Sequence, residues 1–358
     1  MDPHSLCEQF LHWHRPRPSH EVFAELARYA KSKGLEPDTY GSGRFLNEFE
    51  QEIADLLGKE SGLFVISGVM AQQIALRIWC EHQRNRTVAF HATSHLERNE
   101  QRAYSVLQGL DGRLIGDPFA PILVKHVQTF PERLSALLVE LPLRHLGGVL
   151  PSWEQLGALK MYCRERAIRL HLDGARLWEC LPFYDKSYRE ICEGFDSVYV
   201  SFYKGLGALS GAMLVGPKDF IEEARVWLRR MGGNLYQLHP YVVSAKYHLE
   251  KNHNIFADLH DKAQVLAKDL QAIPGIQAVP ARPHTNMMHV LCKGTAEQLN
   301  EAKEQIARED KVWLAARFHD TDSLVWARAE IYMTRDALYI PNDRALALFN
   351  KLMRLASA

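Results

Sequence analysis

The chain of 358 residues has no long apolar run, no net charge and few cysteines, and each shortage excludes a class of protein. No apolar run reaches about 18 residues, so no membrane-spanning helix is predicted. The 43 basic and 43 acidic residues cancel, which gives no electrostatic reason to expect nucleic acid or an anionic membrane as a partner. The first twenty residues also lack the apolar core of a signal peptide.

The cysteines are scattered and form no CxxC pair. They number six and stand at Cys7, Cys80, Cys163, Cys180, Cys192 and Cys292. This spacing predicts neither a zinc cluster nor a disulfide framework. A reducing, cytoplasmic setting is therefore expected.

Several ligand-binding motifs are missing. The dinucleotide fingerprint GxGxxG and the phosphate-binding motif GxxxxGK[ST] do not occur, and the glycine-rich stretch 205–211 has the wrong spacing for the former. His91 and His95 are four residues apart, but the glutamate of HExxH is absent and no third ligand stands out. The sequence therefore argues against NAD, ATP and a metal ion.

Short apolar runs alternate with helical patterns over most of the chain. Strands are predicted at 62–66, 87–91, 135–141, 168–172, 196–202 and 211–216, and helices at 21–33, 47–59, 70–82, 153–166 and 220–231. This alternation predicts an α/β fold with a mostly parallel central sheet. We expect an N-terminal arm and helix over 1–37, a large domain over 38–250, and a smaller C-terminal α+β domain over 251–358, with strands within 275–292.

A carboxylate follows one of the predicted strands. The segment HLDGARLWE (171–179) places Asp173 at the end of a strand, followed at once by Gly174 and Arg176. Ligands of open α/β sheets bind beyond the carboxyl ends of the strands. A carboxylate there suits pyridoxal-5′-phosphate (PLP), because PLP works as an electron sink when its pyridine nitrogen is kept protonated. A simple helix cap is the alternative for Asp173.

A lysine follows a second strand. In DSVYVSFYKGLGALSGAMLVG (196–216), Ser201 ends the apolar run and Lys204 stands before Gly205 and Gly207. A lysine amine in this position suits Schiff-base chemistry, and the glycines allow a bulky ring to approach. A surface lysine in a flexible turn is the alternative, but both flanks are apolar.

A phosphate site is predicted where the strand within 62–66 turns into the helix 70–82. The turn holds Ser67, Gly68 and Val69, and a helix start offers free N–H groups and a positive dipole end. An ordinary N-cap by Ser67 is the alternative. After the next strand, His95 is placed to lie over an aromatic ring, with a structural histidine as its alternative.

Taken in chain order, these segments resemble the threonine aldolase / β-eliminating lyase family of fold-type I PLP enzymes. The resemblance covers roughly residues 38–240 closely and the rest loosely. The most specific matches are HLDGAR (171–176) and SFYKGLGA (201–208), joined by TSHLERNE (93–100), GKESGLFVISGVMAQQ (58–73) and DTYGSGRFLNEFEQEIADLLGKE (38–60). The fold implied is fold-type I, aminotransferase-like.

The resemblance also implies roles for individual residues. Lys204 would hold PLP as a Schiff base, and Asp173 would pair with its pyridine nitrogen. Arg176 would contact the phenolic oxygen of the cofactor and the substrate carboxylate. The ring would be stacked by His95, which would also act as a base, and the phosphate would be cradled by Ser67, Gly68, Val69 and Ser201. A second carboxylate ligand is expected at Arg328, ahead of Arg335.

Three positions depart from the family pattern. Val69 stands where the family usually has a threonine, so this residue offers only its backbone N–H. Leu143 occupies the position of a second active-site histidine, with His145 two residues later. Tyr236 replaces an arginine that reaches phosphate across a subunit interface in the family.

The resemblance implies a lyase that cleaves a β-hydroxy-α-amino acid, threonine-like, into glycine and an aldehyde, with His95 or His145 as base. Another PLP reaction on an amino acid, β-elimination or racemisation, is the alternative, and a non-catalytic protein with the same fold is a third. The expected partner is a small amino-acid substrate, and the expected assembly is a homodimer or homotetramer.

Overall fold

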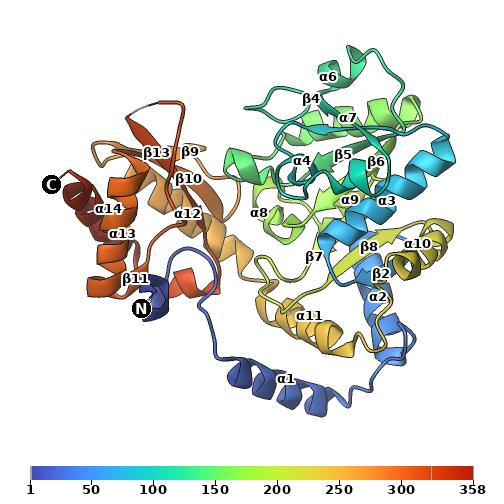
Figure 1. The fold of residues 1–358 in the computed structure, drawn as a ribbon, viewed down its shortest axis with the longest axis horizontal. Helices are drawn as coiled ribbons and strands as arrows, with labels where there is room; N and C mark the ends of the chain where they lie inside the picture. The colour runs from blue at the N-terminus through green and yellow to red at the C-terminus, as the bar shows by residue number, and fades with distance from the viewer. Residues whose placement is uncertain (1, 324, 358) are drawn as a thin grey trace. The chain divides into compact units, whose positions relative to one another are not determined.

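The computed structural model describes residues 2–323 and 325–357, whose contacts divide the chain into two compact units (Figure 1). The larger unit comprises residues 20–143 and 150–253, and the smaller unit comprises residues 2–19, 144–149 and those from 254 onward. The domain limits expected at residues 37 and 250 remain predictions.

A seven-stranded sheet forms the centre of the larger unit. Its strands lie in the order β2-β8-β7-β6-β5-β3-β4, and only β8 runs antiparallel to its neighbours. The strands are β2 Ser61–Val65, β3 Thr87–His91, β4 Asp111–Ile115, β5 Ala136–Glu140, β6 Arg169–Gly174, β7 Ser197–Ser201 and β8 Ala212–Gly216. The predicted α/β class with a mostly parallel sheet is thus confirmed.

Helices surround this sheet. They are α1 Ser19–Lys33, α2 Arg44–Leu57, α3 Gly68–Gln83, α4 His95–Arg98, α5 Ala103–Val106, α6 Val124–Gln128, α7 Trp153–Glu165, α8 Leu181–Tyr184, α9 Tyr188–Cys192, α10 Lys218–Arg230 and α11 His239–Asn252. Helix α3 packs against β6, β7 and β8, and its apolar side chains join the core that also holds Leu63, Leu214 and Phe220. The two buried faces of the sheet explain why its inner strands are continuous apolar runs.

The smaller unit contains a four-stranded antiparallel sheet in the order β12-β13-β10-β9. Helices α12, α13 and α14 pack with it and with one another. The elements are β1 Gln9–Phe10, α12 Phe256–Leu270, β9 Ile276–Val279, β10 Met287–Lys293, α13 Ala296–Asp310, β11 Val312–Trp313, β12 His319–Asp320, β13 Trp326–Tyr332 and α14 Asn342–Ala356. Strands β9 and β10 cover most of the segment 275–292, where strands were expected.

The helices and the cysteines bear on whether the protein spans a membrane or carries disulfides. Within residues 2–323 and 325–357, no helix has both the length and the apolar character that crossing a membrane requires. All six cysteines are buried free thiols. Burial raises the pKa of these thiols, to about 12 for Cys192 and Cys292, so the reactive thiolate is scarce.

Candidate active site

A cavity opens at the carboxyl ends of the parallel strands. Its lining residues all belong to the larger unit. They are Gly68, Val69, Gln72, His95, Glu100, Glu140, Leu141, Pro142, Asp173, Ala175, Arg176, Tyr199, Tyr203 and Lys204. Segments predicted separately from the sequence therefore meet at one place, as expected for an open α/β sheet.

Asp173 lies near the end of β6 and is only 2% exposed. Its Oδ1 accepts a hydrogen bond of 3.1 Å from the backbone N–H of Ala175. Burial raises the pKa of this carboxyl, whereas the nearby His95 and Lys204 act to lower it. An anionic Asp173 therefore needs a cationic partner in the cavity.

Lys204 lies in the loop that reverses the chain between β7 and β8, and this loop is fixed at several points. Within it, the backbone N–H groups of Phe202 and Ala208 donate to Gly211 and Phe202, at 3.0 and 2.9 Å. Outside it, the Ser210 hydroxyl donates to the carbonyl of Ile66, and the Asn252 amide donates to that of Leu206, both at 2.6 Å. The backbone that carries the lysine is thus held in place by the rest of the larger unit.

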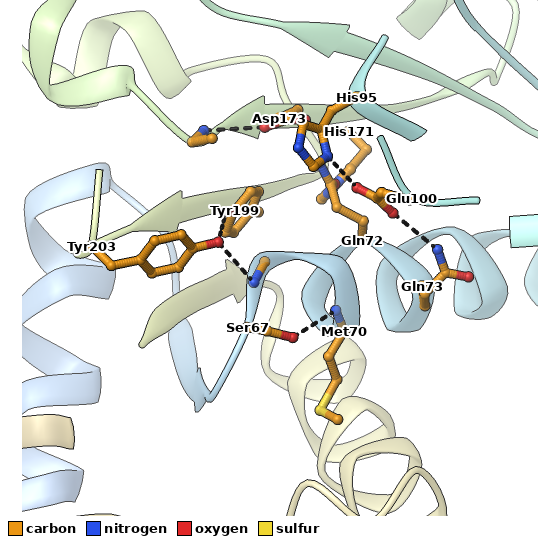
Figure 2. A network of polar contacts seen from close by, with 12 residues as sticks. Ser67, Met70, Gln72, Gln73, His95, Glu100, His171, Asp173, Tyr199 and Tyr203 are labelled. Atoms are coloured by element: carbon orange, nitrogen blue, oxygen red, sulfur yellow. Dashed lines mark hydrogen bonds and ion pairs between the residues drawn. The ribbon is translucent and has the colours of Figure 1, made fainter. Parts of the chain in front are cut away.

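The start of α3 forms one end of the cavity. Ser67 caps this helix, because its Oγ accepts a hydrogen bond from the Met70 N–H at 3.3 Å. The N–H of Gly68 donates to the Tyr203 hydroxyl at 3.4 Å, and Tyr203 contacts the Tyr199 hydroxyl at the same distance (Figure 2). Gly68 has no room for a side chain, since a Cβ there would overlap the Tyr199 hydroxyl.

We expect Gly68→Ala to destabilise the protein by roughly 1–3 kcal/mol, the usual cost of forcing extra atoms into a packed site. The displaced helix start would also weaken phosphate binding. Urea unfolding measures the first effect and cofactor titration the second. The matched control is Gly157→Ala in α7, where a Cβ meets nothing within 4 Å and a gain of about 0.5–1 kcal/mol is expected. Equal stabilities of the Gly68→Ala variant and the unmodified protein would contradict the close packing.

His95 follows β3 and is oriented by a buried carboxylate. Its Nδ1 lies 2.9 Å from Oε1 of Glu100, whose side chain is 2% exposed, and the Gln73 amide donates to the other oxygen of Glu100 at 3.4 Å (Figure 2). A carboxylate only accepts hydrogen bonds, so Nδ1 carries a proton, and in the neutral tautomer with this proton the lone pair lies on Nε2. This is the arrangement of a positioned general base.

The sequence patterns did not single out three polar residues of the cavity: Gln72, Tyr199 and Tyr203. Two of them were detectable from periodicity. Gln72 lies one helical turn after Gly68, and Tyr199 lies two strand positions before Ser201, so each shares a face with a residue already predicted.

Other predicted residues lie apart from the cavity lining. The Ser201 hydroxyl donates to the Ala175 carbonyl at 2.7 Å, so its role toward phosphate stays a prediction. Arg328 is exposed on β13 in the smaller unit, and His145 also belongs to that unit. Their roles toward a substrate stay predictions as well.

The family resemblance implies that TYGSGR (39–44) and MGGNLYQ (231–237) reach a neighbouring subunit, and these two stretches are joined by a hydrogen bond of 2.9 Å from the Tyr40 N–H to the Tyr236 carbonyl. Asp38, only 2% exposed, accepts hydrogen bonds from the backbone N–H groups of Leu238 and His239 at 2.8 and 2.7 Å. The rings of Tyr40 and Tyr236 meet edge to face at 5.3 Å, and both side chains are more than half exposed. Two aromatic side chains are thus presented together to the surroundings.

A family model described as beta-eliminating lyase matches residues 24–293. The chain belongs to the beta-eliminating lyase family. A crystal structure from Listeria monocytogenes, provisionally described as an L-allo-threonine aldolase, has 38% identity and a TM-score of 0.92, and covers 99% of this chain and 98% of its own. The family is PLP-dependent, and the fold is confirmed as fold-type I.

Curated members of the beta-eliminating lyase family agree with this result. The low specificity L-threonine aldolase of Escherichia coli K12 is 30% identical over 259 residues, 71% of this chain and 76% of that protein. The aldolase vrtJ of Penicillium aethiopicum is 32% identical over 246 residues, 65% of this chain and 61% of its own length. The chain thus spans less than two thirds of the length of vrtJ, and the same holds, at 57%, for an uncharacterized relative from Caenorhabditis elegans.

The cavity residues fit PLP. A buried carboxylate, a lysine and the helix start at Gly68 and Val69 line one space, which matches the ring nitrogen, aldehyde and phosphate of the cofactor. A buried amide nitrogen, Nε2 of Gln72, has no hydrogen-bond partner in the described structure, as expected beside a bound polar group. Among the described residues, no group of three or more His, Cys, Asp or Glu side chains is placed to hold a metal ion.

Proposed function

We propose that the protein is a PLP-dependent carbon–carbon lyase that cleaves a threonine-like β-hydroxy-α-amino acid into glycine and an aldehyde. The observation that carries the proposal is that Lys204, Asp173 and an oriented His95 line one cavity. Membership of the beta-eliminating lyase family and the 38% identity to the Listeria structure support it.

Each residue contributes one function. Bound PLP supplies an electron sink for the carbanion left when the Cα–Cβ bond of the substrate breaks. Lys204 Nζ holds the cofactor, and the Asp173 carboxylate keeps the ring nitrogen protonated. Arg176, buried at the cavity wall, binds the substrate carboxylate. His95 Nε2, left as an acceptor by the Glu100 bond at Nδ1, takes the proton of the β-hydroxyl group.

The direct test is to offer the purified holo-protein L-threonine, L-allo-threonine and phenylserine. We expect glycine together with the matching aldehyde, because the broken bond joins Cα to the hydroxyl-bearing carbon. Chromatography of the amino acids and a coupled aldehyde assay measure the two products. If pyruvate and ammonia appear instead, or the opposite enantiomer of the substrate, the aldolase assignment fails while the PLP assignment stands.

We also propose a homodimer or homotetramer in which Tyr40 and Tyr236 face a second copy of the chain. Their joint exposure supports this, since aromatic side chains are enriched at interfaces. Light scattering of the holo-protein should give a multiple of the 41.0 kDa chain mass. An active species of 41.0 kDa would contradict the assembly.

A reducing, cytoplasmic compartment completes the proposal. Six buried free thiols, with no disulfide among them, support it.

A further inference from the structure

A chain of buried hydrogen bonds runs from α3 through β7 and β6 and back to α3. The Trp79 indole N–H donates to Ser197 Oγ at 2.7 Å, Ser197 Oγ lies 2.7 Å from His171 Nδ1, and His171 Nε2 lies 2.6 Å from Gln72 Oε1. All four side chains are at most 2% exposed. We call these four residues the relay. None of the four relay residues has a role in the proposed cleavage reaction.

One arrangement of protons pairs all four side chains within the relay. Burial lowers the pKa of His171 to about 3, so the imidazole is neutral and carries a single proton. Gln72 Oε1 is an acceptor, which places that proton on Nε2 and leaves Nδ1 to accept the hydroxyl proton of Ser197. Ser197 Oγ in turn accepts from Trp79, which can only donate.

With the opposite orientation of the Gln72 amide, the hydroxyl proton of Ser197 would need an acceptor outside the relay. If the Gln72 nitrogen faced His171, Nδ1 would carry the imidazole proton and donate to Ser197. Ser197 Oγ would then accept two hydrogen bonds, and its own proton would lose His171 as acceptor. With its oxygen toward His171, the Gln72 amide completes the relay without an acceptor from outside it, and its nitrogen is directed away from His171.

The Gln72 nitrogen is therefore a hydrogen-bond donor for which the described residues supply no acceptor. It is buried and has no hydrogen-bond partner among the described residues. Leaving a buried donor unpaired is costly, so such an atom calls for an acceptor from outside the chain, such as a ligand, an ion or a water molecule. Gln72 also lines the cavity with Asp173 and Lys204, and Figure 2 shows its side chain rising from α3 toward His171 and His95.

The position of Gln72 along α3 indicates which part of the ligand it meets. The start of α3, near Val69, is the end of the cavity proposed for phosphate, and Gln72 lies one turn after Gly68. Its partner His171 shares a face of β6 with Asp173, two residues on. The unpaired nitrogen is therefore associated with the Asp173 side of the cavity and not with the helix start.

We propose that Gln72 donates a hydrogen bond to the phenolic oxygen on the ring of bound PLP, and that the relay orients the amide for this role. The proposal rests on the PLP function proposed above. It adds a binding residue to the site and gives Trp79, Ser197 and His171 a shared positioning role.

The test is a titration of the cofactor-free protein with PLP and, separately, with pyridoxal, which lacks the phosphate. Gln72→Glu keeps the shape of the side chain and the acceptor for His171 but replaces the donor with a carboxylate oxygen. We expect PLP and pyridoxal to bind about 10- to 100-fold more weakly, by the same factor for each, as for loss of a buried hydrogen bond. Absorbance or fluorescence quenching reports binding without any turnover.

Gln83→Glu, the same change at the far end of α3, is the matched control and should bind both ligands as the unmodified protein does. If Gln72→Glu does not fold, Gln72→Met serves as the test variant, because it removes the donor without adding charge. It should also bind PLP and pyridoxal more weakly. Unchanged binding in a folded Gln72 variant would overturn the proposal, and so would a loss seen with PLP but not with pyridoxal. If the unmodified protein binds no PLP, the proposed function itself fails, which is a distinguishable result.

Discussion

Replacing Lys204 with alanine is expected to abolish covalent attachment of PLP and to lower turnover by about 1,000-fold or more, because a covalent catalyst and its cofactor act as one unit. Lys204→Arg keeps the positive charge but offers no amine for attachment, so it should fail equally. The visible colour of the holo-protein and the rate of glycine release measure the two losses. Borohydride reduction of the unmodified protein should leave PLP on the peptide that contains Lys204.

The control for this prediction is Lys218→Ala, which removes an exposed lysine of the same unit. That variant should keep its colour and rate. PLP fixed to a different lysine after reduction would show that the cavity has been assigned to the wrong residue.

Replacing Asp173 with asparagine is expected to lower turnover by about 100- to 1,000-fold, the usual effect of losing one preorganised electrostatic contact. Asparagine has the same shape but no charge, so the ring nitrogen of bound PLP would lose the group that keeps it protonated. Steady-state rates, corrected for bound cofactor, measure this effect. Near-normal turnover in the Asp173→Asn variant would mean that another group performs this role.

The pH dependence of stability offers an independent check on Asp173. Without cofactor, burial raises the pKa of this carboxyl above the 3.8 of an ordinary aspartate. The unfolded chain therefore releases this proton at a lower pH than the folded protein, and the folded state loses stability as pH rises above about 4. Asparagine does not titrate, so the cofactor-free variant should gain stability relative to the unmodified protein as pH rises above about 4. Urea unfolding at a series of pH values checks the sign.

The parts of the fold that follow from apolar patterns were predictable. The inner strands β3, β5, β6, β7 and β8 are buried along their length and were placed within a few residues. Strand β4, Asp111–Ile115, was missed because it lies at the edge of the sheet, where most of its side chains are not buried and no apolar run forms.

Residues of the candidate site were predictable only where a reactive side chain follows an apolar strand. Asp173 and Lys204 stand at strand ends in distinctive surroundings, and the structure brings them to one cavity. The relay was not predictable, because it depends on the register that sets His171 opposite Ser197 and Asp173 opposite Tyr199. A shift of one residue would turn these side chains to the other face, and no local pattern in β6 or β7 fixes that pairing.

The anchored loop between β7 and β8 has a consequence for affinity. Fixing the backbone of a residue costs about 1–2 kcal/mol in conformational entropy, so a loop of this size that became ordered only on binding would consume roughly 10 kcal/mol of binding energy. The bonds from Ser210 to Ile66 and from Asn252 to Leu206 belong to the folded chain, so the entropy of ordering this loop is lost when the chain folds and not when the cofactor binds. Under the proposed function, PLP would therefore meet a lysine whose backbone needs no further ordering, and the interaction energy of the cofactor would remain available for tight retention.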